Sequence, residues 1–106
     1  MKIAVLPGDG IGKEVVPAAV DVLLTVLPDT EYVLVDVGNE RFMREGTAMS
    51  EKDLDTIKKC DCVLFGAITS PPKKLYPSVI LTLRKELDMY ANVRPFRSNS
   101  MSPYRV

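Results

Sequence analysis

The chain has 106 residues, with 14 basic and 14 acidic side chains, no histidine and an ordinary share of apolar residues. This length and composition fit one small domain with a modest buried core. A formal net charge of zero gives no electrostatic reason to expect nucleic acid or an anionic membrane as a partner, so we predict neither.

Residues 2–27 predict a strand followed by a helix. Residues 2–6 form a continuous apolar run that ends at the turn Pro-Gly-Asp-Gly, which is typical of a buried strand in a parallel sheet. Residues 11–27 carry apolar side chains at helical spacing. No leader sequence precedes this strand and no apolar stretch is long enough for a membrane helix, so we expect a cytoplasmic protein.

The middle of the chain predicts two more strands with helical segments between them. Residues 31–37 are rich in β-branched side chains and lie between turn residues, and residues 62–66 form another strand-like run. Between these strands we expect a loose helical stretch at residues 41–45 and a short helix that Ser50 caps.

Two cysteines, Cys60 and Cys62, lie at the start of the third predicted strand. A disulfide between them is not expected at this spacing. A metal site would need more ligands, and the chain has no histidine to supply them. We therefore predict two buried small apolar side chains and no metal site in this chain.

A proline-rich loop separates the third strand from the last predicted helix. Residues 67–77 contain three prolines, which fix φ and remove backbone donors, so we expect an ordered loop or a mobile lid. Ser78 can cap the helix that follows, and residues 90–93 predict a fourth strand. The buried face of that helix would consist of Val79, Leu83 and Leu87.

The alternation of strands and helices predicts an α/β fold, a mostly parallel sheet with flanking helices. The glycine turn at residues 8–12 invites a Rossmann interpretation, with Asp36 as the acid that binds the ribose. Its second and third glycines are separated by one residue, whereas the Rossmann fingerprint needs two. We therefore do not expect a standard Rossmann domain, and an unrelated nucleotide-binding domain is the weakest alternative.

Two arginines near the end of the chain suggest a site for carboxylates. Arg84 and Arg94 stand ten positions apart across a predicted joint between helix and strand. Because a guanidinium matches a carboxylate with two parallel hydrogen bonds, a pair of arginines suits a small polyacid. Surface ion pairs are the ordinary alternative for both side chains.

Two long motifs resemble the β-decarboxylating dehydrogenases, a family that includes isocitrate, isopropylmalate and homoisocitrate dehydrogenases. The first is Leu-Pro-Gly-Asp-Gly-Ile-Gly-Lys-Glu at residues 6–14, and the second is residues 83–95. The resemblance implies that residues 1–106 form the N-terminal part of an isopropylmalate dehydrogenase-like domain. Family members take their catalytic lysine and tyrosine and their metal-binding aspartates from later segments, so we expect this chain alone to be inactive.

The resemblance also implies a reaction and its participants. Family members oxidise a 3-substituted malate by hydride transfer to NAD or NADP and then release carbon dioxide, with Mg²⁺ or Mn²⁺ polarising the oxygens. Arg84 and Arg94 would bind carboxylates of this hydroxy-polyacid substrate. Thr69 and Ser70 would lie near the nicotinamide, and Ile11 would border the cofactor cleft. The full-length enzyme would be a homodimer or a larger homo-oligomer.

The substrate-facing residues favour an aliphatic substituent. Ser78 matches a serine that contacts substrate in the isocitrate and homoisocitrate enzymes, although helix capping explains it equally well. Ile80 stands where the isocitrate pattern has an asparagine, and Ile80 and Leu81 could form an apolar wall beside Arg84. Pro77 replaces a glutamate of many bacterial isopropylmalate enzymes.

Together these features resemble archaeal-type isopropylmalate or homoisocitrate dehydrogenases. We predict 3-isopropylmalate as the substrate, which would place the enzyme in leucine biosynthesis. Homoisocitrate and isocitrate are the alternative substrates. A truncated, non-catalytic remnant of such an enzyme is the alternative of a different class.

Overall fold

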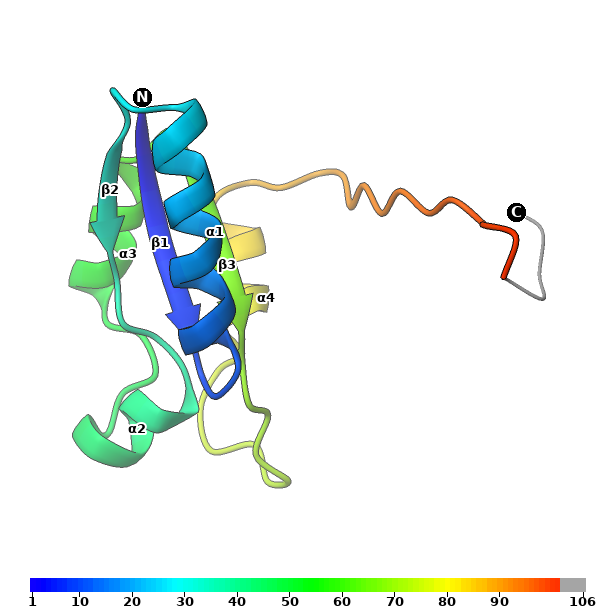
Figure 1. The fold of residues 1–106 in the computed structure, drawn as a ribbon. Coiled ribbons are helices and arrows are strands. Elements are labelled where there is room, and N and C mark those ends of the chain that lie inside the picture. Colours follow the sequence, from blue (N-terminus) through cyan, green and yellow to red (C-terminus); the bar gives the residue numbers. More distant parts are fainter. Residues whose placement is uncertain (102–106) are drawn as a thin grey trace.

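Three strands form one parallel sheet in the computed structural model, which describes residues 1–101 (Figure 1). The order across the sheet is β2-β1-β3, and both neighbours run parallel to the central strand. The predicted α/β fold with a mostly parallel sheet is therefore confirmed. The strands are β1 (Lys2–Gly8), β2 (Glu31–Leu34) and β3 (Cys62–Ala67).

Helices flank both faces of this sheet. Within residues 1–101 they are α1 (Gly12–Val26), α2 (Asn39–Glu45), α3 (Glu51–Lys58) and α4 (Val79–Glu86). Figure 1 shows α1 on one face, α3 and α4 on the opposite face, and α2 near the carboxyl end of β1. No helix in this part of the chain has both the length and the apolar character needed to span a bilayer.

The central position of β1 follows from its apolar side chains, which point to both faces. Ile3 and Val5 pack with Val16 of α1 on one face. Ala4 and Leu6 belong to the larger core on the other face, and each is fully buried. A strand that is apolar on both faces is stable only between two helical layers, which the sequence pattern predicts for residues 2–6.

The helix predictions are confirmed with small shifts in their ends. The short helix begins after Ser50, whose side chain accepts a hydrogen bond from Asp53. The last helix begins after Ser78, whose Oγ accepts the Leu81 N–H at 3.4 Å. Val79 and Leu83 of its predicted buried face are each 2% exposed, and Leu87 is half-buried against the same core.

The second strand is shorter than predicted, because it ends at Leu34 rather than at residue 37. Val35 still donates its N–H to Val5, but the chain then leaves the sheet. In this register the next donor to β2 would be residue 7 of β1, and Pro7 has no N–H, so the ladder ends there. The carbonyl of Asp36 accepts a hydrogen bond from Arg41 of α2 at 2.7 Å.

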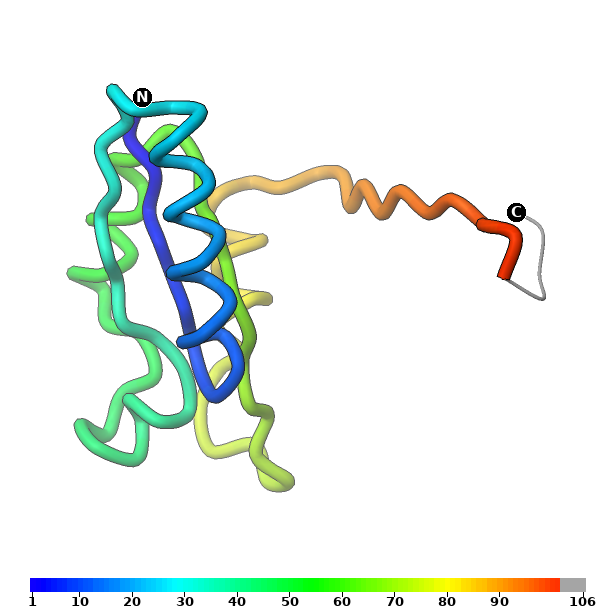
Figure 2. Tube along the Cα trace, in the orientation of Figure 1, coloured from blue at the N-terminus to red at the C-terminus, as the bar shows by residue number. Residues whose placement is uncertain are grey.

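The prediction of a fourth strand at residues 90–93 is wrong. The sheet has only three strands within residues 1–101, and residues 90–101 run away from it as an extended chain (Figure 2). Asp88 follows α4 with a φ of 50° and redirects the chain away from the sheet. Without an adjacent strand to pair with, the backbone groups of residues 90–93 form no ladder.

The prediction of two buried cysteines is wrong for Cys62. Both thiols are free, but Cys62 is exposed at the first position of β3, where the strand emerges at the sheet edge. Cys60 is half-buried, and its sulfur lies 3.4 Å from the carbonyl oxygen of Thr56.

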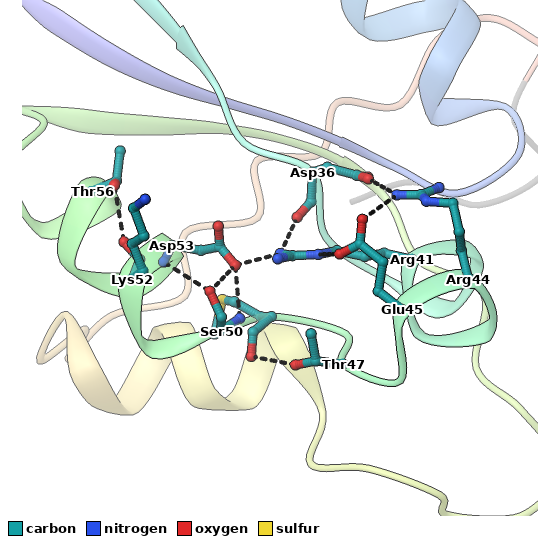
Figure 3. A network of polar contacts seen from close by, with 10 residues as sticks. Asp36, Arg41, Arg44, Glu45, Thr47, Ser50, Lys52, Asp53 and Thr56 are labelled. Carbon is teal, nitrogen blue, oxygen red and sulfur yellow. Dashed lines mark hydrogen bonds and ion pairs between the residues drawn. The ribbon is translucent and has the colours of Figure 1, made fainter.

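A polar network joins α2 to α3 (Figure 3). The carboxylate of Asp53 accepts hydrogen bonds from the N–H of Ser50 at 2.7 Å and from the guanidinium of Arg41. Burial raises the pKa of Asp53, but the hydrogen bonds from Ser50 and Arg41 outweigh it, so the pKa lies below its ordinary value. The ionised carboxylate therefore stabilises the fold.

We expect this network to make stability depend on pH in the acid range. Because the pKa of Asp53 is lower in the folded chain than in the unfolded chain, its contribution is present above about pH 4 and is lost as the pH falls further. Urea unfolding should show a smaller loss of stability between about pH 6 and pH 3 in Asp53→Asn than in the unaltered chain. Asp55→Asn, at an exposed position of the same helix, is the control. Equal pH dependence in both variants would contradict the assignment.

Candidate functional site

Two surface hollows contain most of the predicted site residues, and α4 contributes to both. The first, here called the loop hollow, has a volume of about 270 Å³ and follows the carboxyl end of β3. It is lined by Ile68, Thr69, Ser70, Pro71, Pro72, Lys74, Tyr76, Ser78 and Val79. The second, here called the arginine hollow, has a volume of about 440 Å³. It is lined by Ile80, Arg84, Met89, Tyr90, Ala91, Asn92 and Val93.

The arginine hollow brings Ile80 and Arg84 together on one side of α4. Arg84 follows Ile80 by one helical turn, so the aliphatic side chain lies beside the stem of the arginine. Leu81 is 61% exposed and does not line this hollow. The structure therefore places one of the two predicted aliphatic residues next to Arg84.

Arg94 lies in the extended segment beyond the arginine hollow and is exposed. Among residues 1–101, neither Arg84 nor Arg94 forms an ion pair with a carboxylate. The ordinary alternative for these two arginines, a pair of surface ion pairs, is therefore absent from this part of the chain. Both guanidinium groups can still bind an external anion.

The loop hollow brings together Thr69, Ser70 and Ser78. Thr69 and Ser70 follow the carboxyl end of β3 after one intervening residue, Ile68, and ligands bind beyond such strand ends in parallel sheets. The Thr69 N–H is held by the carboxylate of Asp9 at 2.8 Å. Ser78 caps α4 with its oxygen as an acceptor, so its hydroxyl proton can still be donated to a ligand.

Several backbone N–H groups of the glycine turn before α1 already donate hydrogen bonds within the protein. Gly10 donates its N–H to the Glu40 carboxylate at 2.9 Å, and Glu40 also pairs with Lys13. The hydrogen bond from Lys13 lowers the pKa of Glu40 and keeps it charged. Gly12 donates to the carbonyl of Asp9. These N–H groups cannot hold a phosphate as a Rossmann turn does, and Ile11 is exposed at the start of α1.

Asp9, to which the sequence analysis gave no role, connects the glycine turn to α2 and to the proline-rich loop. Asp9 is 2% exposed, and its carboxylate accepts N–H groups from Asn39 at 2.9 Å, Glu40 at 2.8 Å and Thr69 at 2.8 Å. These partners lie 30 to 60 residues away in the chain. No local spacing signal could have revealed them.

Tyr76 anchors the far end of the proline-rich loop. Its ring packs against Phe42 with the centroids 4.6 Å apart, and its hydroxyl donates to the side-chain oxygen of Asn39 at 3.1 Å. Burial and the charge of Asp9 raise the pKa of Tyr76, so the phenol stays protonated and can donate. The loop is therefore fixed at both ends.

Carboxylates do not gather into a metal-binding cluster within residues 1–101. Asp36 pairs with Arg44 on the surface, and Asp9 is occupied by backbone N–H groups. The carboxylates of Asp36 and Asp9 thus already interact with groups of the protein.

Comparison with known proteins gives consistent results. Residues 2–105 match the sequence profile described as isocitrate/isopropylmalate dehydrogenase. An isocitrate/homoisocitrate dehydrogenase of Pyrococcus horikoshii is 46% identical over 96 residues, which cover 88% of this chain and 27% of that protein. A 3-isopropylmalate/3-methylmalate dehydrogenase of Methanocaldococcus jannaschii is 44% identical over 97 residues, covering 92% of this chain and 28% of that protein.

A solved structure agrees with these sequence matches. The β-decarboxylating dehydrogenase of Thermococcus kodakarensis superposes with a TM-score of 0.76 at 46% identity, over 84% of this chain and 27% of that chain. The chain thus spans less than a third of the length of the curated relatives that it matches.

Proposed function

Because the chain belongs to the isocitrate/isopropylmalate dehydrogenase family, we propose that it forms the N-terminal part of an enzyme that oxidatively decarboxylates a 3-substituted malate. The observation that carries this proposal is the arginine hollow, where Arg84 has no carboxylate partner among residues 1–101 and lies beside Ile80. The remaining catalytic groups and the subunit contacts of a homo-oligomer would come from outside this chain.

In this proposal the two arginines bind and orient the substrate. Arg84 and Arg94 would each hold a carboxylate of the malate, and bidentate contacts would fix the direction of the hydroxyl carbon. The hydroxyl of Ser78, at the start of α4, would donate to the same substrate. This chain would thus supply binding and orientation rather than proton transfer.

In this proposal the loop hollow receives the nicotinamide end of a dinucleotide. It offers the hydroxyls of Thr69 and Ser70 beside the apolar side chain of Ile68, which suits a flat ring with a polar amide. The N–H groups of Gly10 and Gly12 are already used, so the phosphates would be held elsewhere. When bound, NAD or NADP would accept the hydride, and Mg²⁺ or Mn²⁺ would polarise the substrate oxygens.

We favour 3-isopropylmalate as the substrate because Ile80 lines the hollow that contains Arg84. An aliphatic side chain there can contact an isopropyl group but cannot compensate the desolvation of a third carboxylate. Homoisocitrate is the second candidate, because the relative that is 46% identical is named isocitrate/homoisocitrate dehydrogenase.

A chimera would test both the activity and the substrate. This chain would replace the matching segment of the Pyrococcus horikoshii relative, and reduction of NAD and NADP would be followed with 3-isopropylmalate, homoisocitrate and isocitrate. We expect dehydrogenase activity, with a preference shifted toward 3-isopropylmalate relative to the unaltered relative. A folded chimera that reduces neither dinucleotide with any of the three acids would refute the proposed function. A shift toward homoisocitrate would instead establish the second candidate.

A further inference from the structure

The buried carboxylate of Asp9 is the point at which the glycine turn, α2 and the proline-rich loop meet. Its Oδ2 accepts the N–H groups of Asn39 and Thr69, and its Oδ1 accepts the N–H of Glu40. We infer that Asp9 is a positioning residue that holds the backbone of Thr69, and through it the part of the loop hollow that would receive the dinucleotide. This role rests on the proposed function, because Thr69 is the residue expected to lie near the nicotinamide.

Both the backbone and the side chain of Asp9 hold the segment that leaves β3. The Asp9 N–H donates to the carbonyl of Ala67 at 2.7 Å, and the carboxylate accepts the N–H of Thr69 two residues later. The direction of the chain between these residues is therefore set from β1. A charged acceptor at a 2% exposed position makes strong hydrogen bonds to backbone donors.

The space around this carboxylate is closed by Gly38. Gly38 has a φ of 118°, and a Cβ added there would lie 2.6 Å from Oδ2 and 2.8 Å from Oδ1 of Asp9. Only a residue without a side chain allows the carboxylate to reach the N–H groups of Asn39 and Glu40. The position of the Asp9 carboxylate therefore depends on the absence of a side chain at Gly38, which lies in a different loop.

The other end of the loop hollow is connected to the same carboxylate. Tyr76 donates its hydroxyl proton to the side chain of Asn39, and the Asn39 N–H is held by Asp9. Thr69 and Tyr76 both line the loop hollow. Two of its walls therefore depend on one buried acid, which is the feature expected of a positioning group.

Two substitutions separate this role from general support of the fold. Asp9→Ala would leave the N–H groups of Asn39, Glu40 and Thr69 without their acceptor. The asparagine side chain in Asp9→Asn is nearly the same size as aspartate and keeps one acceptor oxygen. Its NH₂ group would face the N–H of Glu40, which is also a donor. We expect the remaining oxygen to accept the N–H groups of Asn39 and Thr69, as Oδ2 does in the unaltered chain. The hydrogen bond from the N–H of Glu40 should be lost.

Amide hydrogen exchange on the 106-residue chain tests the contact directly. In Asp9→Ala, the Thr69 amide should exchange about ten-fold faster or more, while the amides between β1 and β3 keep their protection. In Asp9→Asn, protection should be lost at the Glu40 amide and retained at the amides of Asn39 and Thr69. Asp55→Asn should change none of these amides. Unchanged exchange at Thr69 in Asp9→Ala, or a uniform change across all amides in Asp9→Asn, would overturn the inference.

Kinetics of the chimera test the consequence for the cofactor. Asp9→Ala should raise the KM for the dinucleotide about ten-fold while the KM for the hydroxy acid changes less than about two-fold, and Asp9→Asn should recover part of this loss. Partial unfolding would instead lower kcat and leave both KM values unchanged. An active Asp9→Ala chimera with an unchanged dinucleotide KM would overturn the inference without touching the proposed function. An inactive parent chimera would refute the proposed function, and hydrogen exchange would still decide whether Asp9 holds Thr69.

Discussion

Replacing Arg94 by alanine in the chimera should lower kcat/KM by about a hundred- to a thousand-fold. A substrate carboxylate that loses its guanidinium partner is left partly desolvated and unpaired, which costs about 3 to 4 kcal/mol in the transition state. Arg94 is exposed and forms no ion pair with a carboxylate among residues 1–101. Steady-state kinetics with the preferred hydroxy acid measure the effect.

Arg97→Ala provides a matched control for this result. Arg97 is an exposed arginine in the same extended segment, and we propose no substrate contact for it. Its replacement should leave kcat/KM within about two-fold. Arg94→Lys should give an intermediate loss, because lysine keeps the charge but lacks the planar fork. Equal activity in Arg94→Ala and Arg97→Ala would count decisively against substrate binding by Arg94.

Replacing Gly12 by alanine should destabilise the fold by about 3 kcal/mol or more, or prevent folding altogether. In an ordinary helix this change would stabilise by up to about 1 kcal/mol. Here Gly12 is the buried first residue of α1, and an added Cβ would overlap the carbonyl oxygen of Pro7 and lie 2.9 Å from the N of Ala67. Relief would require α1 to move away from the sheet, which would open the core around Val16.

Gly46→Ala is the control for Gly12→Ala. Gly46 follows α2 with a φ of 79°, but no atom lies within 4 Å of a Cβ added there. Its replacement should cost only about 1 kcal/mol from backbone strain. Urea unfolding of the two variants measures the difference. Similar losses at both positions would mean that the contact between α1 and the sheet can relax.

The elements that the sequence predicted well are those with a local signal. The apolar run at residues 2–6, the helical spacing of residues 11–27 and the cap at Ser50 each lie within one short stretch of chain, and the structure contains all three elements. The parallel arrangement follows from their alternation.

The features that the sequence did not predict depend on contacts between distant residues. β2 ends where Pro7 of the neighbouring strand has no N–H to donate, although the β-branched run continues to Val37. Tyr90 and Val93 have side chains that favour strands, but residues 90–93 have no neighbouring strand within residues 1–101. Propensity describes a single segment, whereas strand formation depends on a partner.

In the candidate site, too, some residues could be proposed from local sequence motifs and others could not. The chemistry of Arg84 and Thr69 could be proposed from motifs in the sequence, and the structure places each beside a hollow. The role of Asp9 could not be proposed, because its three donors come from residues far along the chain. The role of a buried acid depends on the groups that contact it in the folded chain, and a single sequence does not show which groups these are.

The central place of β1 also has a consequence for the order in which the chain acquires its structure. β1 is synthesised before β2 and β3, yet the N–H of Lys2 donates to the Asp61 carboxylate, 59 residues later, at 2.7 Å. Closing so long a loop is slow, because its entropy is lost before the contacts of β3 are gained. Until β3 has been synthesised, the edge of β1 that pairs with it has no partner. We therefore expect the apolar strand to be most prone to association with other chains before Ala67 emerges from the ribosome.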